Sequence, residues 1–148
     1  MSSQLHDIGK ISIKDEILLK PGGLSLEEAE EMKKHVAFGM DIIEKVAEST
    51  TESAFLTHAK LLAGCHHEKW DGTGYPLGSK GEEIPLQGRL MAVVDVYDAL
   101  TNDRPYKLAF THREAIEIIK DGLHKHFDPL IGEIFVQYER DFERTCAI

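Results

Sequence analysis

Residues 66–76 read HHEKWDGTGYP, and the interpretation of the whole chain depends on this stretch. Two adjacent imidazoles, those of His66 and His67, stand at the end of an apolar segment with helical periodicity, and a glycine-rich loop follows them. Imidazole is the commonest protein metal ligand, and long loops without secondary structure usually have a functional role. The stretch therefore predicts a metal centre with a loop that covers the substrate.

The composition fits one acidic domain in a reducing compartment. The chain has 148 residues, a net charge of -9 and two cysteines, Cys65 and Cys146, which are too few for a disulfide framework. We therefore expect a cytoplasmic location. No apolar run approaches the roughly 20 residues of a membrane span, and the negative charge disfavours DNA as a partner. A phosphate-bearing substrate would need metal ions and a few local cations.

Helical patterns account for most of the chain. Two capping boxes, Ser25 with Glu28 and Thr111 with Glu114, mark helix starts, and Asp128-Pro129 marks a third. Apolar residues recur at helical spacing after each start, and no segment alternates as a half-buried strand does. The sequence therefore predicts an all-α helical bundle. We expect its helices over residues 25–47, 53–66, 86–100, 111–122 and from 129 onward, where the last helix begins.

The segment 86–100 is apolar on almost every side, which predicts a buried helix. Asp95 stands in its middle, between two valines. A buried carboxylate is costly unless it is paired or bound to a metal. The pattern therefore requires a cation beside Asp95.

The candidate metal ligands are imidazoles and carboxylates from four separate segments. They are His6, Asp7, His35, His66, His67 and Asp95. A set without thiolates suits iron, manganese or another borderline first-row metal better than structural zinc. The set is too large for one ion, and a carboxylate such as Asp7 can bridge two ions that activate a water and bind phosphoryl oxygens. These residues predict metal-assisted hydrolysis of a phosphate ester.

Several motifs, in their order along the chain, resemble the signature of the HD-GYP domain, a branch of the HD phosphohydrolases. They are His6–Lys10, Lys20–Gly22, His35, His66–Glu68, Asp71–Pro76, Pro85, Asp95–Leu100, Arg104–Tyr106 and His126–Pro129. The resemblance extends from Leu5 to about Tyr138, and we expect a single HD-GYP domain over residues 1–148.

This resemblance implies an all-helical bundle that hydrolyses cyclic di-GMP to linear pGpG, and in some members on to GMP. It also implies two or three divalent metal ions, often iron or manganese. By position, His6 and Asp95 resemble ligands of one ion and Asp7 resembles the bridging ligand. The ligands of the neighbouring ion or ions would be His35, His66 and His67.

The resemblance also assigns residues to the substrate. Lys10 resembles the lysine that holds the scissile phosphate and assists the leaving group. The residues near the bound dinucleotide would be Tyr75, Asp98, Arg104 and Lys107. For Tyr75 two interpretations stay open, since its ring would either stack on a guanine or anchor the loop.

The family pattern has a further metal ligand on a helix upstream of the His6-Asp7 pair, and this sequence begins only a few residues before that pair. We therefore expect weak metal binding, low activity, and an exposed apolar groove where the missing helix would pack, which a homodimer would cover. Two alternatives stay open: a catalytically impaired module that binds a dinucleotide or a partner protein, and an HD-type nucleotide phosphohydrolase. The resemblance also implies fusion to a receiver or sensor module in bacterial signalling.

Overall fold

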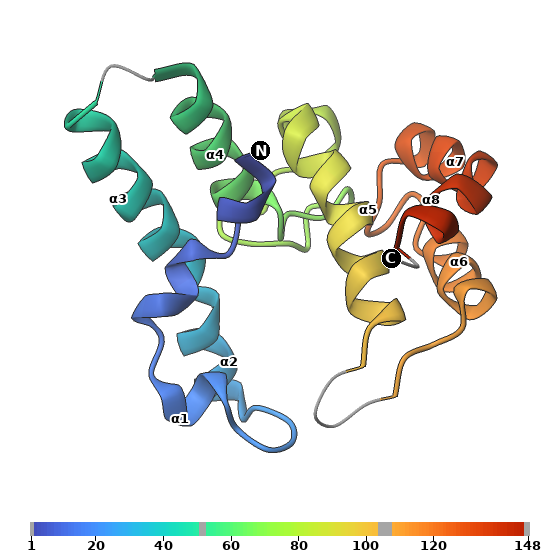
Figure 1. The fold of residues 1–148 in the computed structure, drawn as a ribbon, viewed down its shortest axis with the longest axis horizontal. Helices are drawn as coiled ribbons and strands as arrows, with labels where there is room; N and C mark the ends of the chain where they lie inside the picture. Colours follow the sequence, from blue (N-terminus) through green and yellow to red (C-terminus); the bar gives the residue numbers. More distant parts are fainter. Residues whose placement is uncertain (1, 51–52, 104–107, 147–148) are drawn as a thin grey trace.

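The computed structural model describes residues 2–50, 53–103 and 108–146, and this part of the chain is helical (Figure 1). Its elements are η1 Ser2–Leu5, η2 Ile8–Ser12, α1 Asp15–Leu18, α2 Leu26–Lys33, α3 His35–Glu48, α4 Ser53–Cys65, η3 Gly81–Glu83, α5 Leu86–Thr101, α6 His112–Asp121, α7 Pro129–Gln137 and α8 Glu139–Cys146. The described residues contain no strand, only an isolated bridge between Leu123 and Phe127. The all-α prediction is confirmed.

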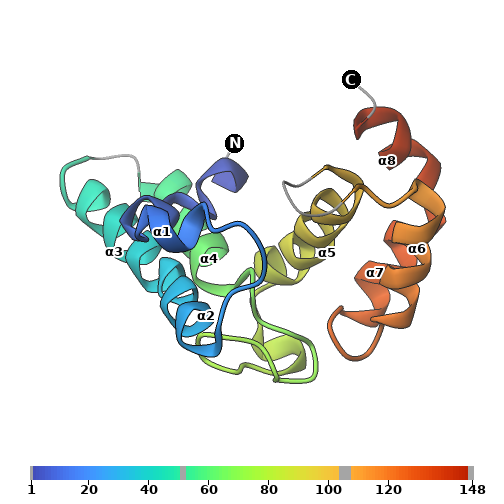
Figure 2. The same ribbon diagram turned by 90° about the horizontal axis from the view of Figure 1, so that it is seen from below.

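The helices form two groups that diverge like the arms of a V (Figure 2). In the first group α3 packs on α4, and η1 and η2 lie against this pair. In the second group α5 packs on α6 and α7, and α5 also contacts α4, which joins the two groups. Each group has its own apolar core, centred on Ile43 and Ala59 in the first and on Ile119 and Phe127 in the second. None of the described helices is long and apolar enough to cross a membrane.

The expected helix starts are present. The Ser25 hydroxyl accepts from the Glu28 N–H at 3.2 Å, and the Glu28 carboxylate accepts from the Ser25 N–H at 2.6 Å. Thr111 and Glu114 form the same reciprocal pair before α6. Asp128 caps α7 by accepting from two backbone N–H groups of the first turn.

The single helix predicted over residues 25–47 is wrong at Lys34, where α2 ends and α3 begins. The Lys34 N–H donates to the Glu31 carbonyl, three residues back, at 3.1 Å. The His35 ring nitrogen Nδ1 lies 2.7 Å from the Met32 carbonyl oxygen, the acceptor that the Val36 N–H would use in a continuous helix. The His35 side chain thus contacts the backbone at the break between the two helices.

The prediction that α5 is buried on almost every side is also wrong. Leu86, Leu90 and Val94, which follow one another at intervals of four, are each about half exposed. Together with α7 and α8 this face forms an apolar hollow of about 130 Å³. The chain also continues beyond the predicted last helix into α8.

Candidate metal centre

Four of the six candidate ligands meet where several elements end. Asp7 lies between η1 and η2, His35 is the first residue of α3, and His66 and His67 follow α4 directly. One ligand atom from each of these four residues lies within 4.8 Å of the others. His35 and His66 are 1% and 2% exposed. The fold therefore gathers three imidazoles and a carboxylate from distant segments into a largely buried cluster.

The hydrogen bonds of two histidines fix which ring nitrogen faces the cluster. Nδ1 of His66 lies 3.0 Å from the Leu62 carbonyl oxygen, and Nδ1 of His35 is bonded to a carbonyl in the same way. Since a carbonyl can only accept, each Nδ1 carries the proton and each Nε2 of the neutral ring carries a lone pair. Metal-binding histidines are commonly oriented by such a bond to a carbonyl. Both rings are thus oriented as ligands.

Three acceptor atoms converge at the cluster without a donor. The two Nε2 atoms of His35 and His66 lie 3.4 Å apart, and Asp7 Oδ1 lies 3.4 Å from the first and 3.7 Å from the second. This buried oxygen has no hydrogen-bond partner among the described residues. Buried acceptors that face one another are unfavourable unless a cation lies between them. The donor set and its geometry therefore fit a divalent metal ion.

His67 completes the cluster. Its ring centroid lies 4.0 Å from that of His66 and 5.1 Å from that of His35. Burial, and then these two imidazoles, lower the pKa of His67 to about 3. Burial is also the main cause that lowers the pKa of His35. Both rings are therefore neutral at ordinary pH, which is the form that binds metals.

Asp7 is ionised and faces two sides. Burial raises its pKa, but the hydrogen bond with His6 and the nearby Lys10 ammonium hold the pKa below its usual range. Oδ1 faces His35 and His66, whereas Oδ2 is paired with the Lys10 ammonium and lies 3.4 Å from His6 Nε2. The two oxygens of one carboxylate thus point to different sets of candidate ligands, as a bridging ligand would.

His6 and Asp95 form the second set. His6 Nε2 lies 3.6 Å from Asp95 Oδ1, and the His6 ring meets the His66 ring edge to face at 5.0 Å. The hydrogen bond with His6 lowers the pKa of Asp95, although burial opposes the shift. Both residues line a cavity of about 270 Å³ that also reaches Asp98, one turn further along α5. His6 is the partner that lies beside Asp95, and the Asp95 side chain is partly exposed rather than buried as expected.

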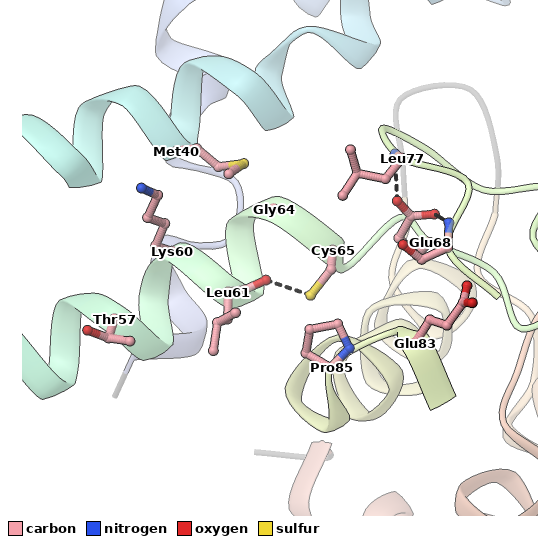
Figure 3. Close-up of a pocket in the computed structure, with 11 residues that line it drawn as sticks. Met40, Thr57, Lys60, Leu61, Gly64, Cys65, Glu68, Leu77, Glu83 and Pro85 are labelled. Carbon is pink, nitrogen blue, oxygen red and sulfur yellow. Dashed lines mark hydrogen bonds between the residues drawn. The ribbon is translucent and has the colours of Figure 1, made fainter. Parts of the chain in front are cut away.

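Glu68, which the sequence analysis named only as part of a motif and without a role, holds the glycine-rich loop. Its side chain is 2% exposed, and its carboxylate accepts from the N–H groups of Leu77 at 2.7 Å and Ser79 at 3.1 Å (Figure 3). A Cβ at Gly74 would lie 2.6 Å from the His67 carbonyl oxygen, so only glycine fits there. In the sequence, the only sign of this role was that Glu68 directly follows the paired histidines.

The loop places Tyr75 on the cluster. The Tyr75 N–H donates to the His67 carbonyl at 3.2 Å, and the two rings stack at 4.7 Å with 23° between their planes. One face of the tyrosine ring therefore covers a candidate ligand. Of the other predicted substrate contacts, Asp98 is exposed at the end of α5, and Arg104 and Lys107 lie outside the described residues.

A separate cavity of about 530 Å³ lies at the end of α4, between Met40, Lys60, Cys65 and Leu77 (Figure 3). It shares Glu68 with the loop but contains none of the candidate ligands. Burial, and then the Glu68 charge, raise the pKa of Cys65 to about 11, and the thiol donates to the Leu61 carbonyl at 2.6 Å. Cys65 is thus an unreactive structural residue.

An all-helical domain with a buried His/Asp cluster able to hold a metal ion is the class of protein that this fold and site define. The family model described as "HD domain" matches residues 1–131. The chain belongs to the HD domain family, in its HD-GYP branch.

Curated relatives match nearly the whole chain. A "Cyclic di-GMP phosphodiesterase" of Vibrio cholerae is 50% identical over 99% of this chain and 30% of its own length. The "Cyclic di-GMP phosphodiesterase response regulator RpfG" of Xanthomonas campestris is 40% identical over 99% of this chain and 38% of its own. A "3'3'-cGAMP-specific phosphodiesterase 2" of Vibrio cholerae is 39% identical over 95% of this chain and 26% of its own. The chain thus spans about a third of the length of such relatives.

Proposed function

We propose that the chain is the catalytic domain of a metal-dependent phosphodiesterase that hydrolyses cyclic di-GMP to linear pGpG, with GMP as a further product to be tested. The observation that carries the proposal is the convergence of Asp7 Oδ1 and two imidazole Nε2 atoms on one point without a donor. The names of relatives that are 40–50% identical over most of the chain support the substrate.

HD domains depend on metals, and we propose two or three divalent ions, iron or manganese, for this one. His35, His66, His67 and Asp7 Oδ1 would hold one ion, and His6, Asp95 and Asp7 Oδ2 would hold a second. Such ions, when bound, polarise phosphoryl oxygens and lower the pKa of water. The carbonyl bonds of His35 and His66 keep the rings oriented before any ion arrives.

The remaining chemistry is proposed for the chain's own residues. The Lys10 ammonium, paired with Asp7 and partly exposed, can contact an oxygen of the scissile phosphate and donate a proton to the leaving oxygen. Asp7 keeps that ammonium beside the metal ligands. Tyr75 shields His67 from water and forms a wall against which the substrate would lie. Asp98, Arg104 and Lys107 remain proposed substrate contacts.

A second candidate substrate is 3'3'-cGAMP, because relatives with that printed specificity are 34–42% identical to this chain. Both substrates are cyclic dinucleotides with two phosphodiesters, so one site can serve either. The two further alternatives make distinct predictions: a silent binding module would bind a dinucleotide without cleaving it, and a nucleotide phosphohydrolase would prefer mononucleotides.

We propose that the domain works inside a longer signalling protein, since the chain covers about a third of its relatives and one of them is named a response regulator. The single-domain organisation over residues 1–148 and the cytoplasmic location stay predictions. A homodimer also stays a prediction.

The test measures both the metal content and the activity of the same protein. Protein purified without chelators is analysed for its elements and then assayed with cyclic di-GMP, 3'3'-cGAMP and a mononucleotide under added Mn²⁺ or Fe²⁺. We expect the parent chain to cleave a cyclic dinucleotide, and Asp95→Ala to contain less metal and to lose activity. The matched control is Asp41→Ala, which removes an exposed carboxylate from α3. Unchanged metal content in Asp95→Ala would refute its role as a ligand, and metal-loaded protein that cleaves no cyclic dinucleotide would refute the function.

A further inference from the structure

Lys33, to which the proposed function assigns no role, lies near the metal cluster, separated from it by the ring of Tyr75. Lys33 is the last residue of α2, and its ammonium nitrogen lies over the Tyr75 ring, 5.5 Å from the centroid. The same ring stacks on His67 at 4.7 Å. Tyr75 therefore connects a candidate metal ligand to a lysine from a different part of the chain. A cation over an aromatic face is a favourable contact, which keeps the ammonium near this rim of the site.

The substrate's charge gives this lysine a role. A cyclic dinucleotide carries two phosphodiester charges, and this chain has a net charge of -9, so binding depends on local cations. The metal ions and Lys10, paired with Asp7, would serve the phosphodiester that is cleaved. The other phosphodiester must lie outside that centre. It needs a cation at the rim, where Lys33 is.

Lys33 is now paired with Glu30, and a phosphate oxygen could take the place of this carboxylate. The ammonium lies 2.5 Å from a carboxylate oxygen of Glu30, and the two side chains are 42% and 69% exposed. Exposed pairs of this kind contribute little to stability, because water and salt screen them. A phosphate oxygen could therefore replace Glu30 at small cost. The flexible lysine stem allows the ammonium to move from the carboxylate to a ligand above Tyr75.

We propose that Lys33 is a substrate-binding residue whose ammonium contacts the phosphodiester that is not being cleaved. The proposal rests on the proposed function, since it requires a substrate with two phosphodiesters. It makes Tyr75 a spacer that keeps Lys33 at a set distance from the metal cluster. Of the two interpretations of Tyr75 that the sequence left open, it favours the one in which the ring anchors the loop.

Lys34 provides a matched control. It follows Lys33 directly and pairs with Glu31 as Lys33 pairs with Glu30, three residues back in both cases. Its side chain is 55% exposed, and it is Lys33 whose ammonium lies over the Tyr75 ring. Substituting either lysine by alanine removes one positive charge and one exposed ion pair from the same helix end. Only the first substitution removes the cation over Tyr75.

Binding is measured first, by calorimetry on the metal-loaded chain with a hydrolysis-resistant phosphorothioate analogue of cyclic di-GMP. We expect Lys33→Ala and Lys33→Gln to weaken binding about fivefold, the size of one exposed charge contact. Lys34→Ala should stay within about twofold of the parent chain. In turnover of cyclic di-GMP, KM should rise by the same factor while kcat is retained.

A substrate with a single phosphodiester separates this role from a merely structural one. Bis(4-nitrophenyl) phosphate has no second phosphodiester, so Lys33→Ala should cleave it as the parent chain does. An equal loss with this compound would mean that Lys33 acts on the metal cluster through Tyr75, and would overturn the proposal.

Failure of the inference and failure of the proposed function give different results. If the parent chain binds the dinucleotide and both Lys33 variants match Lys34→Ala, the role of Lys33 is wrong and the proposed function stands. If the metal-loaded parent chain neither binds nor cleaves any cyclic dinucleotide, both are wrong.

Discussion

Removing the Glu68 carboxylate should loosen the loop that covers the metal cluster. In Glu68→Ala the N–H groups of Leu77 and Ser79 lose their acceptor. Each buried N–H without a partner costs about 1–3 kcal/mol, and since these two are only partly buried we take about 2–3 kcal/mol for both. For a domain of this size that loss of unfolding free energy lowers Tm by roughly 4–12 °C. Glu68→Gln keeps one acceptor oxygen and should lose about half as much.

Two measurements separate loop loosening from general damage. Circular dichroism gives Tm, and the fluorescence of Trp70, the sole tryptophan, reports the loop itself. The backbone N–H of Trp70 donates to the His126 carbonyl at 3.1 Å, so this part of the loop is fixed in the parent chain. In Glu68→Ala we expect a red shift of the emission at temperatures well below Tm, as water reaches the indole.

The control is Glu82→Ala, which removes an exposed carboxylate from the same loop. It should change neither Tm nor emission. A Glu68→Ala chain that melts within about 1 °C of the parent, with unchanged emission, would show that the two hydrogen bonds do not hold the loop.

Three further predictions concern the backbone contact beneath the site, a helix cap and the buried thiol. Gly9→Ala should lower both stability and metal retention, because a Cβ there would overlap the His35 carbonyl oxygen. Elemental analysis and denaturation check this. The control is Gly23→Ala, where a Cβ meets nothing within 4 Å. Thr111→Ala should lower the unfolding free energy by about 1 kcal/mol through loss of the α6 cap, and an unchanged urea midpoint would contradict this. In a Cys146→Ser background, the Cys65 thiol should resist a disulfide reagent at about pH 8 until the chain unfolds. Its pKa is raised to about 11, so the reactive thiolate stays scarce in the folded state below that pH; rapid modification of folded protein would refute the assignment.

Features that depend on local spacing could be predicted from the sequence. The capping boxes at Ser25 and Thr111 use residues three apart, and the structure contains both. His66 ends an apolar segment with helical periodicity, and its ring is buried. Local spacing determines these features because a helix places residues three and four apart on one face, whatever surrounds it.

Features that depend on distant partners could not be predicted. Apolar residues on almost every side predicted that α5 is buried, but its neighbours leave Leu90 and Val94 partly exposed. The acceptor role of Glu68 depends on N–H groups nine and eleven residues away, in a loop with no periodic pattern. The contact between Lys33 and Tyr75 joins two segments whose packing no local rule specifies.

The position of Asp7 between the two sets of candidate ligands depends on Gly9, which has no side chain. Gly9 packs against the backbone of α3, where a Cβ would overlap the His35 carbonyl oxygen and the Gly39 nitrogen. This close approach brings Asp7, two residues earlier, beside the first residue of α3, with Oδ1 toward His35 and Oδ2 toward His6. A bulkier residue at position 9 would force η2 away from α3 and separate the carboxylate from the imidazoles. The glycine after the His-Asp pair is therefore as much a part of the proposed metal centre as the ligands, because it fixes the distance between them.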